Sequence, residues 1–137
     1  MIKRICLVED VRELDFMQDL FKRHTRKGEY EIGCYPDLSH EKVYRKYLPE
    51  NHDFYWLHSS TVEFDAINKI KEEQPWSKIV VRTSVKEIST VNSYLRENKI
   101  DKVLSSLDGL NEKKVIEILK DVGIELILQQ EVLDKKW

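Results

Sequence analysis

Polar side chains that could bind ligands or take part in a reaction stand at the ends of several short apolar runs. They are Glu9 and Asp10, His58, Arg82 with Thr83 and Ser84, and Ser105 with Ser106. Paired carboxylates are ligands for hard cations such as Mg²⁺, and an imidazole beside them completes a plausible ligand set for a transition metal. If the runs are parallel strands, these residues meet at the edge of the sheet where α/β proteins place their ligand sites.

Five β-prone runs must position these groups, and each is followed by apolar residues that recur at helical spacing. The runs are residues 4–9, 30–35, 54–58, 79–83 and 102–106. Repeated alternation of strand and helix predicts a doubly wound α/β domain, in which helices cover both faces of a parallel sheet.

Capping residues mark where these helices begin and end. Ser39 and Asn111 are expected N-caps, and Ser84 with Glu87 three positions later matches a capping box. Gly123 is expected to end the last helix. The domain is therefore predicted to span residues 1–123, and residues 124–137 are expected to form an extra helix or a linker.

Composition excludes several classes of protein. The chain has 137 residues, 41% hydrophobic and 35% charged, with a formal net charge of −2. The interspersed charges offer no basic footprint for nucleic acid or an anionic membrane, and no apolar run approaches the roughly 18 residues of a membrane span. We expect a cytoplasmic protein in which Cys6 and Cys34 are reduced packing residues.

The order of the strand-end residues resembles the receiver domains of bacterial response regulators, over residues 3–122. Leu7-Val8-Glu9-Asp10 matches the acidic pair that holds magnesium in that family, and Thr83 matches the hydroxyl residue that ends its fourth strand. The resemblance implies a flavodoxin-like sheet with strand order 2-1-3-4-5.

The sequence departs from the receiver pattern at its reactive positions. His58 stands where the family has its phosphorylated aspartate, and Ser106 stands where it has a lysine. Leu107 replaces the following proline, and Val103 replaces the aromatic switch residue. Phosphoryl transfer to a receiver needs a carboxylate nucleophile and positive charge around the transferred group. The chain is therefore interpreted as a pseudo-receiver that small phosphodonors do not modify.

Three roles remain open for His58. It could accept a phosphoryl group itself, it could bind a metal together with Glu9 and Asp10, or it could fill the pocket and hydrogen-bond Asp10 or Glu9. An imidazole beside carboxylates is stabilised by charge pairing, which favours the structural role.

Two functions follow from the resemblance, and neither is enzymatic. The first is a phosphorylation-independent signalling module that binds a protein partner, a second copy of the chain being one candidate, through the fourth helix, fifth strand and fifth helix (roughly residues 87–98, 102–106 and 112–122). The alternative is a regulatory domain gated by a divalent metal or a small ligand at Glu9, Asp10 and His58. No cofactor is expected beyond weakly bound Mg²⁺ or another divalent cation.

Overall fold

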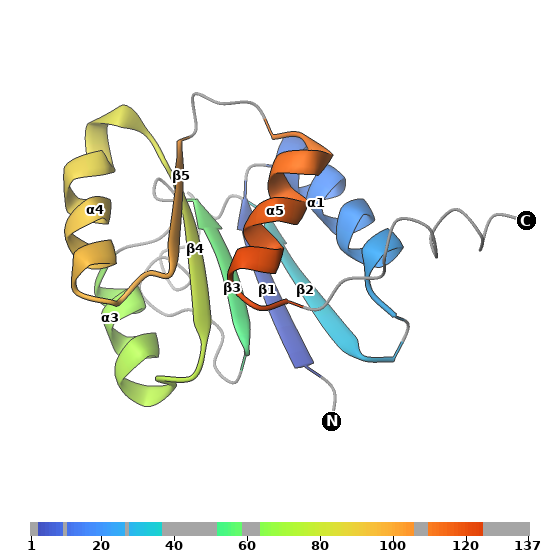
Figure 1. Ribbon diagram of the computed structural model, residues 1–137, viewed down its shortest axis with the longest axis horizontal. Coiled ribbons are helices and arrows are strands. Elements are labelled where there is room, and N and C mark those ends of the chain that lie inside the picture. Colours follow the sequence, from blue (N-terminus) through green and yellow to red (C-terminus); the bar gives the residue numbers. More distant parts are fainter. Residues whose placement is uncertain are drawn as a thin grey trace, which may run out of the picture.

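Five parallel strands form one sheet, with helices on both of its faces (Figure 1). The computed structural model describes residues 3–9, 11–26, 28–36, 52–58, 64–105 and 110–124. The strands are β1 (Lys3–Glu9), β2 (Tyr30–Pro36), β3 (Phe54–His58), β4 (Lys78–Thr83) and β5 (Lys102–Ser105). Their order in the sheet is β2-β1-β3-β4-β5, which confirms the predicted topology.

Helices follow the strands as the alternating pattern predicts. They are α1 (Val11–His24), α3 (Phe64–Glu73), α4 (Ile88–Arg96), preceded by the 3₁₀ turn η1 (Val85–Glu87), and α5 (Glu112–Asp121). The helix expected after Ser39 lies outside the described residues, and so do residues 125–137 of the expected extension 124–137.

The sheet separates two apolar cores because successive side chains of a strand point to opposite faces. Ile5 and Leu7 of β1 pack with Trp56 of β3 in the core beneath α1 and α5. Cys6 and Val8 belong to the other core, beneath α3 and α4. Cys6 is a buried, reduced cysteine, as expected, whereas the side chain of Cys34 is not described.

Two predicted caps have different outcomes. Asn111 caps α5 as expected, since its Oδ1 accepts a hydrogen bond of 2.9 Å from the backbone N–H of Lys114. The capping box at Ser84 is wrong, because that side chain makes no bond to the helix backbone. The Ser84 hydroxyl instead donates to the carboxylate of Glu87 at 3.4 Å. A 3₁₀ turn, closed by the bond from the Glu87 backbone N–H to the Ser84 carbonyl oxygen, precedes α4.

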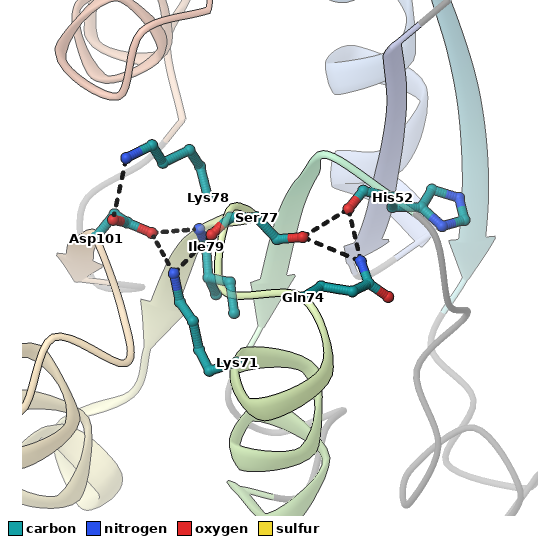
Figure 2. Close-up of polar contacts among 7 residues, drawn as sticks. All are labelled: His52, Lys71, Gln74, Ser77, Lys78, Ile79 and Asp101. Atoms are coloured by element: carbon teal, nitrogen blue, oxygen red, sulfur yellow. Dashed lines mark hydrogen bonds and ion pairs between the residues drawn. The ribbon is translucent and has the colours of Figure 1, made fainter.

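A polar network ties together the segments that precede β3, β4 and β5 (Figure 2). Asp101 Oδ2 accepts from the backbone N–H of Ile79 at 2.7 Å and from Lys71 Nζ at 3.3 Å. Buried Ser77 and Gln74 both donate to the carbonyl oxygen of His52, at 2.7 and 2.9 Å. These bonds lie at the N-terminal ends of the strands, so they fix the sheet from the end opposite the predicted site.

The end of α1 is joined to the start of α5 by a charge cluster. Glu112 Oε1 lies 2.6 Å from His24 Nε2 and 2.8 Å from Arg23 Nη1. His24 is buried, whereas the Glu112 side chain is 42% exposed. The hydrogen bond from His24, and secondly that from Arg23, lower the pKa of Glu112 below its ordinary value of 4.5.

The lowered pKa of Glu112 predicts how the α1–α5 contact depends on pH. A carboxyl group whose folded-state pKa is depressed stabilises the fold above its unfolded pKa and loses that contribution as pH falls through the folded value. Relative to Glu112→Gln, the wild type should therefore lose stability as pH falls below 4.5, by less than about 1 kcal/mol because this carboxylate is partly exposed. Urea unfolding of the wild type and Glu112→Gln across this pH range measures the change. Glu117→Gln, on an exposed position of the same helix, is the control, and its difference in unfolding free energy from the wild type should not follow that of Glu112→Gln.

Candidate functional site

A buried ion pair occupies the C-terminal edge of the sheet. Arg82 Nε donates to Glu9 Oε1 at 2.7 Å, and Arg82 Nη2 donates to Glu9 Oε2 at 3.0 Å. The Glu9 side chain is fully buried and that of Arg82 is 8% exposed. Two parallel charge-assisted hydrogen bonds of this kind are the strongest arrangement that a guanidinium and a carboxylate can make.

Strand register brings the two charges together across a third strand. Val8 pairs with Leu57, and His58 pairs with Arg82, so Glu9, His58 and Arg82 lie at the same level of three adjacent strands. Alternation along each strand places all three on the face that carries Trp56. Because β3 lies between β1 and β4, the ion pair bridges the end of β3.

Trp56 supplies a third donor to the same carboxylate. Its indole Nε1 lies 3.4 Å from Glu9 Oε1, a longer contact than the two from Arg82. The Trp56 ring is fully buried in the core beneath α1 and α5. The carboxylate of Glu9 is thus held from β3 and β4 by groups that its own strand does not provide.

His58 ends β3, which is the position where the sequence places it. The side chain is half-buried and stands beside Arg82 in the strand register. Asp10 lies outside the described residues, so the expected hydrogen bond from His58 to Asp10 or Glu9 stays a prediction.

The other predicted site residues that the structure describes, Thr83 and Val103, lie on the opposite face of the sheet from Glu9. Thr83 is buried, and alternation places it on the face of Val81, opposite to Glu9. Its hydroxyl donates to the backbone oxygen of Ser84 at 3.1 Å. Val103 packs against the core beneath α3 and α4. Ser106 lies outside the described residues.

The predicted metal ligands are incompletely described. Among the residues that the structure describes, no group of three His, Cys, Asp or Glu side chains could hold a metal ion. The one described acid of the predicted set, Glu9, has both oxygens bonded to Arg82 and therefore does not fit a divalent cation in this arrangement. The proposed set of Glu9, Asp10 and His58 stays a prediction, since Asp10 lies outside the described part of the chain.

Arg82 is the site residue that sequence reasoning did not assign. The sequence pattern places it only among the polar residues at the ends of the apolar runs. A signal was present, because an arginine within an apolar run that is buried on both faces needs a partner of opposite charge. Glu9 and Asp10 are acids expected at that edge of the sheet, so the pair could have been proposed from the sequence.

A second candidate site is an apolar surface on α4 and on the 3₁₀ turn that precedes it. Val85, Ile88 and Leu95 are 61%, 39% and 36% exposed, and we call them the α4 flank. Val91 is buried, and the ring of Tyr94 lies 5.1 Å from that of Phe64 of α3.

The direction of the α4 flank follows from helical geometry. Ile88 and Leu95 are seven residues apart, so they lie on one line along the helix, on the opposite side of Val91 from Tyr94. Ile88 and Leu95 therefore lie on the side of α4 that is turned away from α3. The edge strand of the sheet, β5, is packed against α4 (Figure 1). This is the part of the molecule that the sequence assigned to partner binding.

Comparisons with known proteins identify the fold. No protein-family model and no curated protein sequence matches the chain. A response regulator receiver domain protein (CheY-like) from Methanospirillum hungatei matches over 88% of this chain and 93% of its own, with a TM-score of 0.62 and 16% identity. The receiver domain of AraT, a response regulator from Geobacillus stearothermophilus, matches over 99% of this chain and 98% of its own. Its TM-score is 0.63 and its sequence identity is 13%. The signal receiver domain of an HD domain-containing protein from Pseudomonas fluorescens matches over 89% of this chain and 94% of its own, with the same TM-score of 0.63 and the same identity of 13%.

These likenesses extend over nearly the whole of the matched receiver domains, and their strand order is the one found here. No helix in the described part of the chain is both long and apolar enough to cross a membrane. Sheet order, helix placement and structural likeness together show that this chain has the CheY-like flavodoxin fold of response regulator receiver domains.

Proposed function

We propose that this protein is an atypical receiver-like signalling module that acts in the cytoplasm through protein–protein contact and without phosphorylation. The observation that carries the proposal is the α4 flank, where the apolar side chains of Val85 in η1 and of Ile88 and Leu95 in α4 are exposed. Clustered exposed apolar residues rimmed by polar ones are typical of interaction sites.

Charged residues frame the α4 flank with both signs. Lys86 and Glu87 lie at its N-terminal end, and Arg96 and Glu97 lie at its C-terminal end. A polar rim around a small apolar centre favours a specific, reversible contact. The edge strand β5 is packed against α4, so a partner bound to the α4 flank could also contact β5.

The polar end of β3 supports independence from phosphorylation. The strand ends in His58, whose imidazole cannot form the acyl phosphate that a receiver aspartate forms. Receivers shift a two-state equilibrium when they are phosphorylated. A module without the acceptor carboxylate, and with Val103 in place of the switch aromatic, is expected to stay in one state.

Charge substitutions on the α4 flank test the proposal. We expect Ile88→Asp combined with Leu95→Asp to reduce the binding of a partner captured by the wild type by roughly 10-fold or more, because apolar anchors at the centre of an interface carry most of its energy. Quantitative pull-down against the chain's own cellular extract, followed by titration of the captured partner, measures the loss. Size measurement of the purified chain over a concentration series decides whether that partner is a second copy.

Trp76 provides the matched control, since it is 58% exposed but lies outside η1 and α4. Trp76→Asp should leave the binding unchanged. Incubation with acetyl phosphate and Mg²⁺ should change neither the intact mass of the wild type nor its affinity for the partner. A phosphorylated species that alters the affinity, or equal binding by the wild type and the double variant, would remove the proposal.

A further inference from the structure

We infer that the guanidinium of Arg82 takes the place of a divalent cation at Glu9, so that this edge of the sheet is held in one arrangement without any metal. The resemblance implies a cation-binding acidic pair at this position, whereas the described geometry gives one acid of that pair to an arginine. The inference concerns the pocket alone and stands whether or not the α4 flank binds a partner.

The ion pair uses the groups that a cation would need. Both carboxylate oxygens of Glu9 accept from Arg82, and Trp56 Nε1 also lies near Oε1, at 3.4 Å. A metal ligated by Glu9 would have to displace these donors, and it would stand beside the positive guanidinium. Charges of the same sign repel strongly where water is excluded. Geometry and charge therefore both act against a divalent ion beside Glu9.

Burial explains why some positive group is required there. Glu9 is fully buried, and an isolated carboxylate in a protein interior is strongly destabilising. In a metal-dependent pocket the compensating charge arrives with the ion and depends on its concentration. Arginine is charged across the physiological pH range, so the compensation here is permanent.

The ion pair also fixes the relative positions of three strands. Arg82 on β4 reaches Glu9 on β1 at the level of His58, the last residue of β3. A bidentate bond fixes the direction of the guanidinium as well as its distance. The ion pair thus already holds together the strand ends that would have to move to admit an ion.

Cation titration of a small set of variants tests the inference. The set comprises the wild type, Arg82→Ala, Arg82→Lys, Glu9→Gln and the double variant Glu9→Gln/Arg82→Ala. Thermal unfolding is recorded with and without millimolar Mg²⁺ or Mn²⁺, and calorimetry measures binding of each ion. We expect the melting temperature of the wild type to be unaffected and that of Arg82→Ala to rise by roughly 3 °C or more, since a ligand that binds only the folded state stabilises it.

The other variants separate a site at Glu9 from binding elsewhere. Arg82→Lys keeps a positive charge next to Glu9 and should not gain a cation response. The double variant lacks the carboxylate and should not gain one either. If Arg82→Ala does not fold, calorimetry on the wild type and on Arg82→Lys still decides the question. Binding of Mg²⁺ or Mn²⁺ by the wild type that Glu9→Gln abolishes would overturn the inference, and so would a folded Arg82→Ala that gains no response.

Discussion

Replacement of Arg82 by Met is expected to lower the free energy of unfolding by about 3–5 kcal/mol, because it leaves the buried carboxylate of Glu9 without its charge partner. Methionine keeps most of the apolar stem of the arginine, so the loss reports the missing charge and hydrogen bonds more than a cavity. Urea denaturation of the two proteins at neutral pH measures the difference.

A double variant separates the ion pair from the other effects of the substitution. Glu9→Leu combined with Arg82→Met should recover most of the lost stability, because two apolar residues of similar volume can replace a buried pair at little cost. Arg4→Met is the matched control, since Arg4 and Glu31 form an ion pair at 3.6 Å with side chains 50% and 65% exposed. That control should change stability by less than about 1 kcal/mol. A loss for Arg82→Met no larger than that of the control would contradict a structural role for the pair.

The expected recovery bears on why the pair is present. A buried ion pair is weak evidence for net stability, because desolvation of both charges offsets their attraction. Its more specific effect is geometric, since it connects β1 and β4 across the end of β3. An ion pair that fixes these strand ends supports the proposal that this domain stays in one state.

The fold could be predicted from the sequence because its signals are local and mutually consistent. The run at residues 79–83 is buried on both faces, as a central parallel strand must be, and Asn111 caps the helix that it was expected to cap. The strand order came from the family resemblance, since periodicity says nothing about which strands are neighbours. The Ser84 capping box failed because a 3₁₀ turn intervenes before α4.

The candidate site could be predicted only in part, because its contacts join residues far apart in the sequence. The end position of His58 follows from its place in an apolar run. The partner of Glu9 is 73 residues away, and Glu112 meets His24 at a separation of 88 residues. Such pairs depend on strand register and on the reach of long side chains, neither of which a local pattern encodes. The exposure of Ile88 and Leu95 could not be predicted for a related reason, since helical spacing shows which residues share a face of a helix but not whether another element covers that face.

Substitution of Asp101 by Ala is expected to cost about 2–3 kcal/mol of unfolding free energy, because it removes the acceptor at the centre of the N-terminal network (Figure 2). The buried backbone N–H of Ile79 would lose its bond of 2.7 Å to Asp101 Oδ2. Lys71 would lose its carboxylate partner at 3.3 Å, although its Nζ still donates to the backbone oxygen of Ser77 at 2.6 Å. Urea denaturation measures the loss.

Asp101→Asn divides this loss into its two components. The amide oxygen of asparagine can still accept from Ile79, so this variant should lose only the ionic part, about 1 kcal/mol. Asp121→Ala is the matched control, because Asp121 makes one exposed ion pair with Lys102 at 3.2 Å and should change stability little. We expect the loss of unfolding free energy to be largest for Asp101→Ala, smaller for Asp101→Asn and smallest for Asp121→Ala. That order identifies the hydrogen bond to the Ile79 backbone as the main contribution. Equal losses for Asp101→Ala and Asp101→Asn would instead assign the stability to the charge, and the network would then depend on salt concentration.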